Sequence, residues 1–197
     1  MLIEGTILGL ILGKVRGGKF SSLGDVQING WIVLILALLL QLTPIISEDF
    51  PFFAKYQSYI YATSIILTMI CICMNLKKKG MWAFFIGILL NLIVIAFNGF
   101  QMPISFSALK AAGLESMINA IQSGDMMHYR ALTGVAQWAK LLAKFVPIPK
   151  PYPLPKVISI GDIFITLGLI LFIMGEMKKS KFNVRHRMIK HGYKGRI

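Results

Sequence analysis

Residues 159–177 read SIGDIFITLGLILFIMGEM, and this stretch decides the fold class. Ser159 and Asp162 have the spacing of a capping box, in which the hydroxyl accepts from an unpaired N–H and the carboxylate lies at the positive end of the helix. The apolar run that follows is long enough to cross about 30 Å of hydrocarbon as a helix. We therefore expect a membrane-spanning helix that starts at Ser159 and ends near Met177.

Four more apolar blocks precede this one, at about residues 1–15, 30–46, 57–75 and 81–97. The chain of 197 residues is 56% hydrophobic and 15% charged, and apolar blocks of this length need lipid around them. The sequence thus predicts an all-α fold, a multi-pass transmembrane bundle of about five spans with a short first span. Residues 1–177 form one membrane domain in this interpretation, and residues 178–197 form a basic cytoplasmic tail.

The longest stretch between two of these spans has two parts. Residues 103–146 have amphipathic spacing, for example at Phe106, Leu109 and Met117, and predict extracytoplasmic helices that lie in the membrane interface or cap the bundle. Residues 147–155 place proline at every second position, which excludes a helix. We expect a rigid, extended strap that runs across the bundle, with a peptide-docking motif as the alternative.

The charge pattern predicts orientation. The net charge is +13, and the basic residues gather at the ends of apolar blocks and in the tail. Because basic residues favour the cytoplasmic side, we expect residues 14–19, 77–79 and 178–197 inside the cell and the N-terminus outside. The same charges would suit nucleic acid, a partner we do not favour. Tail residues expected to bind anionic lipids are Lys178, Lys179, Lys181, Arg185, Arg187 and Lys190.

Small and polar residues within the apolar blocks predict how the helices pack. Gly5, Gly9 and Gly13 have four-residue spacing, so they share one helix face and let a neighbouring backbone approach closely. Asn91 lies in the middle of an apolar block, where its amide needs a partner. We expect Asn91 to face the other helices.

Four features occur together along the chain. They are the glycine-rich opening before Arg16-Gly17-Gly18-Lys19, the turn at 98–103, His128, and Pro147-Ile148-Pro149 leading to the capping box. Together they resemble an uncharacterised bacterial integral-membrane family, domain-of-unknown-function family 5317. The resemblance implies a protein of the bacterial cytoplasmic membrane without an assigned activity. Where the family turn often reads Asn-Gly-Gly, this chain has Phe100.

Candidates for chemistry are few. Asp125 and His128 are three residues apart and could share a helix face as a base and its orienting partner, or could be a helix-start residue and an interfacial histidine. Asp162 lies near hydrocarbon, where an ionisable group is a functional candidate, although it also suits a helix cap. The remaining histidines lie in the tail and both cysteines lie within a span, so we predict neither a metal nor a cofactor.

Three functions are compatible with this pattern. The leading hypothesis is a non-enzymatic accessory or scaffold subunit of a bacterial membrane complex, which contacts another membrane protein or a second copy of itself. The alternative is a small transporter or channel subunit, with Gln41, Asn91 and Thr166 along a path. The third is an outer-leaflet membrane enzyme that uses His128.

Overall fold

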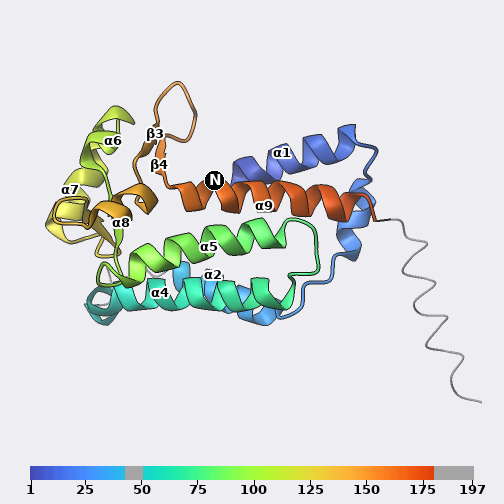
Figure 1. The fold of residues 1–197 in the computed structure, drawn as a ribbon, viewed down its shortest axis with the longest axis horizontal. Coiled ribbons are helices and arrows are strands. Elements are labelled where there is room, and N and C mark those ends of the chain that lie inside the picture. The colour runs from blue at the N-terminus through green and yellow to red at the C-terminus, as the bar shows by residue number, and fades with distance from the viewer. Residues whose placement is uncertain (43–50, 180–197) are drawn as a thin grey trace, which may run out of the picture.

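The computed structural model describes residues 1–42 and 51–179, with the side chains of residues 51–54 left out. The end of the expected 30–46 helix and the tail from residue 180 lie outside the described residues. Helices account for most of the described chain (Figure 1). The principal ones are α1 (Leu2–Val15), α2 (Trp31–Gln41), α4 (Pro51–Met74), α5 (Met81–Ala96) and α9 (Ile160–Met177), and a short 3-10 helix, η1 (Phe20–Asp25), follows α1.

The five principal helices lie side by side in an order that differs from their order in the chain. Helix α9 packs between α1 and α5, α5 also packs on α4, and α4 packs on α2 (Figure 1). The capping box predicted for the start of α9 is confirmed, because Ser159 Oγ accepts from Asp162 N at 3.0 Å and Asp162 Oδ2 accepts from Ser159 N at 3.1 Å. The helix therefore begins where its sequence signal lies.

The expected all-α bundle of five spans is wrong. Within the described residues, only α4, over Lys55–Met74, and α9 are long and apolar enough to cross a membrane. Helices α1, α2 and α5 have 14, 11 and 16 residues, and at 1.5 Å per residue they reach only about 17–24 Å, less than the roughly 30 Å of a hydrocarbon core. Apolar composition located these helices but did not fix their lengths.

Two small sheets also contradict the all-α prediction. Strand β1 (Met102–Ile104) pairs in parallel with β2 (Tyr129–Ala131), and β3 (Val146–Ile148) pairs antiparallel with β4 (Lys156–Ile158). The chain at Lys144 runs along the other edge of β1, since Lys144 N donates to Pro103 O at 3.0 Å. Strand β1 is therefore buried between two neighbours. We call residues 98–158, which contain these strands, the cap.

The cap does not contain the two long amphipathic helices expected over residues 103–146. It contains three short ones, α6 (Phe106–Ala111), α7 (Glu115–Ser123) and α8 (Gln137–Leu142). Gly113 has a φ of +71°, which ends the first expected helix, and the strand pairing of β2 interrupts the second. The apolar positions that suggested a membrane-facing surface, among them Leu109 and Met117, instead pack with Ile104 and Val157 in a core of the cap.

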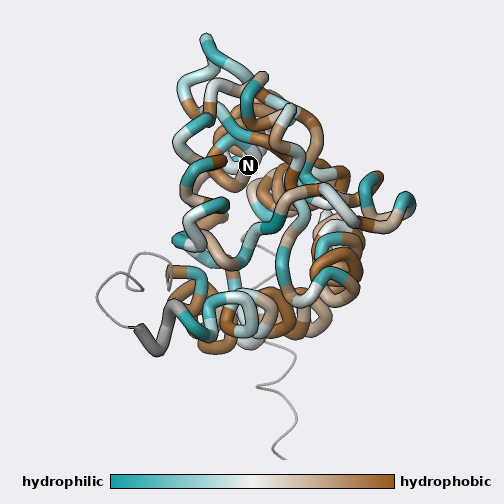
Figure 2. The backbone as a smooth tube through the Cα atoms, turned by 90° about the vertical axis from the view of Figure 1, so that its left-hand side faces the viewer, coloured by the Kyte–Doolittle hydropathy of each residue, from teal (hydrophilic) through white to brown (hydrophobic). Residues whose placement is uncertain are grey.

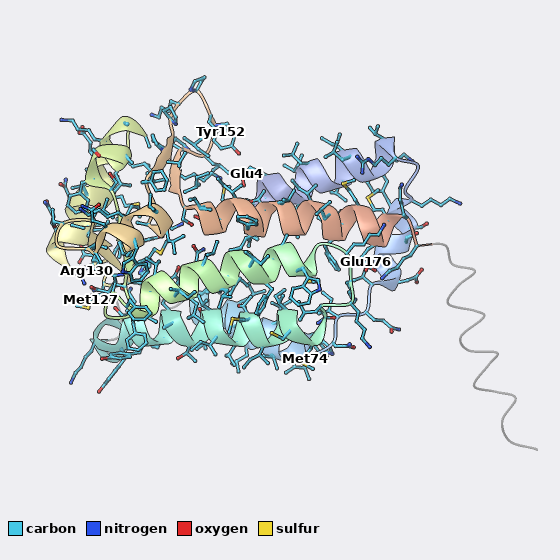
Figure 3. The ribbon with its side chains drawn as sticks, in the orientation of Figure 1. Glu4, Met74, Met127, Arg130, Tyr152 and Glu176 are labelled. Atoms are coloured by element: carbon cyan, nitrogen blue, oxygen red, sulfur yellow. The ribbon has the colours of Figure 1, made fainter. Side chains whose placement is uncertain are left out.

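The proline-rich segment is a hairpin rather than a strap across the bundle. No residue of 147–155 is helical, but only the first two lie in a strand, and residues 150–154 form turns and bends. Val146 pairs with Ile158, so the chain between them doubles back. The hairpin contacts the start of α1, where Tyr152 Oη donates to Glu4 Oε1 at 2.6 Å and Lys156 forms an ion pair with the same carboxylate (Figure 3). The segment therefore anchors α1 instead of spanning the helices.

Large apolar side chains remain exposed along the helices. Figure 2 shows the helices largely as hydrophobic segments, whereas hydrophilic segments are concentrated in the connections and the cap. We call the exposed apolar surface of the five helices the apolar belt. It includes Ile3, Ile7, Ile11, Ile32, Ile35, Leu39, Ile66, Ile70, Trp82, Ile86, Ile163, Leu167 and Leu171.

Candidate functional site at the junction of cap and helices

A largely buried ion pair joins the cap to α9. Lys144 follows α8 and is held beside β1, where Ser105 N donates to Lys144 O at 2.9 Å. Its Nζ lies 2.6 Å from Oδ2 of Asp162, which is in the first turn of α9. The two side chains are 16% and 13% exposed, so water screens their attraction poorly.

Asp162 has further partners that complete a network. Asn91 Nδ2, on α5, donates to Asp162 Oδ1 at 3.2 Å, and Ser159 N donates to Oδ2. Asn91 Oδ1 in turn accepts from Ser159 Oγ at 2.9 Å. An ammonium, an amide and a backbone N–H therefore surround one carboxylate, as a buried charge requires. We call Asn91, Lys144, Ser159 and Asp162 the junction network.

Glycines let α5 and α9 approach closely enough for this network to form. A Cβ at Gly87 would lie 2.5 Å from Gly161 O, and a Cβ at Gly168 would lie 2.5 Å from Phe84 N. Gly161 itself lies against the Asn91 amide. No larger side chain fits at Gly87 or Gly161 without moving a backbone, so these positions set the separation at which Asn91 reaches Asp162.

The three glycines of α1 lie against the opposite face of α9. Gly5, Gly9 and Gly13 are buried, and a Cβ would lie 3.2 Å from Leu169 at Gly5 and 3.0 Å from Ile173 at Gly9. Gly13 lies against Met177. Helix α9 is thus packed against a glycine-containing neighbour on two sides.

The charge of Lys144 is stabilised where it lies. Burial lowers the pKa of the Lys144 ammonium, but Tyr129 and the Asp162 carboxylate raise it by more, so the net pKa lies above its ordinary value. Lys144 is therefore protonated at neutral pH. It acts as a fixed positive charge for Asp162 rather than as a proton acceptor.

His128 lies next to the junction network in the turn before β2, and its side chain is buried. Its Nδ1 lies 3.4 Å from Gln57 Oε1, and its ring centroid lies 4.3 Å from that of Tyr129 and 5.2 Å from that of Tyr61. Burial, and secondarily the charge of Lys144, lowers the pKa of His128 to about 4. A neutral imidazole with so low a pKa is a weak general base at neutral pH.

The structure does not bring Asp125 to His128. Their spacing would let the two share a helix face, but α7 ends at Ser123 and Gly124 follows with a φ of +89°. Asp125 is exposed and accepts from Ser123 Oγ at 2.5 Å, whereas His128 is 7% exposed. In the described residues Asp125 and His128 therefore have different partners, because the chain between them forms a turn.

The proposed transport path is not assembled either. Asn91 and Thr166 both lie near Asp162, but Thr166 Oγ1 donates to Asp162 O at 2.8 Å within its own helix. Gln41 is exposed at the end of α2, which packs on α4 rather than on α9. The three side chains therefore do not line one path in a single copy of the chain.

The other predicted site residues lie at the opposite end of the molecule or beyond the described residues. Lys178 and Lys179 are exposed after the end of α9. Residues 1–42 and 51–179 contain no group of three or more His, Cys, Asp or Glu side chains placed to hold a metal ion. The remaining predicted lipid-binding residues, Lys181, Arg185, Arg187 and Lys190, lie outside the described residues.

Sequence reasoning missed two parts of this site. Gly80 and Gly87, like Gly161 and Gly168, are seven residues apart, and this spacing places each pair on one helix face. It would have indicated close packing of α5 and α9. The second missed part is the backbone of Phe100, whose φ of +61° lies in the left-handed region that favours glycine.

Comparison with known proteins gives a match over most of the chain. The sequence profile of DUF5317, a family of unknown function, matches residues 25–174, which include the entire junction network. The chain belongs to this family. This DUF5317 member is also similar to an uncharacterized protein of Thermotoga maritima, with 24% identity over 191 residues that cover 97% of this chain and 99% of that protein. No solved structure matches the chain.

The extent of the match covers most of the features that suggested the family. The turn at 98–103, His128, the 147–149 prolines and the capping box of α9 lie within the matched residues of this DUF5317 member. The remaining feature, at residues 16–19, precedes the matched residues. The family description assigns no activity.

Proposed function

We propose that this DUF5317 member is a membrane-embedded, non-enzymatic accessory subunit of a bacterial membrane complex, with α4 and α9 as its longest apolar helices in the bilayer. One observation supports it above the others: the polar side chains of the junction network are satisfied by one another, whereas the apolar belt is left uncovered. The protein thus offers lipid and partner proteins a surface, and offers substrates little reactive chemistry.

The apolar belt supports the membrane location. In the stretches of α4 and α9 that could cross a membrane, only 28% and 33% of residues are buried. A core helix of a soluble protein would be mostly buried, and soluble monomers rarely expose apolar patches of this extent. Polar and charged groups lie instead at the two ends of the helices, with Arg130 at one end and Glu176 at the other (Figure 3).

The orientation is supported by contacts that gather basic segments at one end. Lys19 N donates to Met177 O at 2.9 Å, which places residues 14–19 beside Lys178. Lys78 Nζ donates to Gln27 O in the connection between η1 and α2. Since basic residues favour the cytoplasm, this end faces inward and the cap faces outward.

The junction network supports an accessory role over an enzymatic one. Catalysis needs polar groups that converge where a substrate can reach them. Asp162 already has an ammonium, an amide and a backbone N–H as partners, and His128 is buried. These contacts hold the cap at a fixed position on the helices, which suits a subunit whose shape is recognised by a partner.

Photo-crosslinking in the bacterial host tests this proposal. A photoreactive amino acid replaces Leu39, in the apolar belt, or Leu154, an exposed cap residue that serves as the comparison position. We expect one of them to give a reproducible adduct with a different membrane protein, and native mass spectrometry to find that protein in fixed stoichiometry. Adducts with lipid or with a second copy of the chain alone, at both positions, would contradict the accessory role.

A further inference from the structure

A shallow pocket opens in the cap beside β2. Its volume is about 480 Å³, within the range of small-ligand sites. Phe106, Ile121 and Tyr129 form an apolar and aromatic part of its wall, and Gln101 and Gln122 add side-chain amides. Arg130 supplies the one charge among the lining residues.

Arg130 is not neutralised by the protein around it. Its side chain is half-buried, and its hydrogen bond to Asn98 O has a length of 3.5 Å, the outer limit for such a bond. In the part of the chain that the structure describes, no acidic group lies within 4.0 Å of its guanidinium. A guanidinium has five N–H donors, so within the described residues most of the donors of Arg130 have no protein acceptor.

Lys144, also in the cap, is a cation whose charge is balanced by a protein carboxylate. Lys144 has Asp162 at 2.6 Å, whereas Arg130 has one carbonyl at the limit of hydrogen bonding. A partly buried cation is stabilised by an anion with matching geometry, and the planar fork of arginine matches a carboxylate or a phosphate. The cap also has six basic and two acidic side chains, so the local field favours an anion.

We propose that this pocket binds an organic anion, a phosphate or carboxylate group carried on an apolar body. Arg130 binds the anionic group, and Phe106, Ile121 and Tyr129 contact the apolar part. The anion comes either from a lipid headgroup or from a small soluble molecule. This site is separate from the junction network, and the proposal does not depend on the accessory role.

Titration of the purified full-length chain in a nonionic detergent tests this site. The probes are glycerol 3-phosphate, hexanoate, dihexanoylphosphatidylglycerol and, as the lipid without net charge, dihexanoylphosphatidylcholine. We expect saturable binding of at least one anionic probe. Arg130→Gln should weaken it at least tenfold and Arg130→Lys by less, because an ammonium keeps the charge but loses the two-pronged contact.

Lys140→Gln is the matched control, because Lys140 is an exposed cation of the cap on α8 that does not line the pocket. It should change the affinity less than twofold. Binding by soluble anions assigns the source to a small molecule, and binding by dihexanoylphosphatidylglycerol alone assigns it to a lipid headgroup. Absence of binding by every anionic probe, equal binding of dihexanoylphosphatidylcholine, or an equal loss in Lys140→Gln would overturn the proposal.

Discussion

The two ends of α9 each pair an acidic side chain with a lysine, but in different surroundings. At the cap end, Asp162 and Lys144 are 13% and 16% exposed. At the other end, Glu176 is 5% exposed but its partner Lys179 is 57% exposed and lies three residues away in the chain. Buried pairs are costly to break, whereas pairs with an exposed partner are worth little, so the same chemistry has different consequences at the two ends.

The two ion pairs differ in what they join. Lys144 precedes the β3–β4 hairpin in the chain and Asp162 follows it, in α9. This pair therefore joins the cap to the helices. Lys179 reaches Glu176 within one turn, so that pair joins only neighbours in the chain. We therefore expect the attachment of the cap to depend on the junction network, and the other end of α9 to tolerate change.

The largest effect is expected from Lys144→Met. Removing the ammonium leaves the Asp162 carboxylate buried without its cation, and the loss of unfolding free energy is on the order of 3–5 kcal/mol. Lys179→Met, the matched change at the other end of α9, should cost less than about 1 kcal/mol. Thermal unfolding of detergent-solubilised protein measures both. Similar losses in the two variants would remove the distinction between the ends.

The next largest effect is a loss of stability at low pH. Burial lowers the pKa of His128 from 6.5 to about 4, so between these values the unfolded chain binds a proton that the folded chain does not. Stability should fall as the pH drops through this window, by on the order of 3 kcal/mol in total. His128→Asn removes the titrating group and should show a correspondingly smaller decline. Parallel stability profiles for the two proteins between pH 7 and about pH 4 would contradict this burial effect.

A moderate effect is expected from Gly87→Ala. The added methyl would lie 2.5 Å from Gly161 O and force α5 and α9 apart, at a cost of roughly 1–3 kcal/mol. Gly24→Ala is the control, because nothing lies within 4 Å of a Cβ there and the backbone needs no glycine. Unfolding midpoints measure both variants. An unchanged midpoint for Gly87→Ala would show that the close approach is unimportant.

The smallest effect is expected from Ser159→Ala, at about 1 kcal/mol, the usual value of a helix N-cap. Ser159 Oγ caps α9 and also donates to Asn91. Ser105 provides the comparison, since its Oγ accepts from Ala108 N at 3.2 Å to cap the short α6. Chemical unfolding of both variants should show the larger loss for Ser159→Ala. A larger loss for Ser105→Ala, whose Oγ also lies 2.8 Å from Ser107 Oγ, would contradict this order.

Local signals in the sequence predicted the helices but not the cap. Ser159 and Asp162 located the start of α9 because a capping box involves residues three apart. The Lys144–Asp162 pair depends on the β3–β4 hairpin and on the pairing of the chain with β1, and amphipathic spacing does not report strand pairing between distant segments. Gly113, which lies within the segment expected to form amphipathic helices, has a positive φ and ends α6.

Cysteine accessibility in native membranes tests the membrane location most directly. In a Cys71→Ala, Cys73→Ala background, Ile66→Cys and Leu167→Cys place a thiol in the apolar belt near the middle of α4 and α9, and Leu154→Cys places one in the cap, all at exposed positions. We expect a membrane-impermeant maleimide to label Leu154→Cys readily and to label the two belt variants only after denaturation. Equal labelling of all three, or recovery of the protein in the soluble fraction, would contradict it.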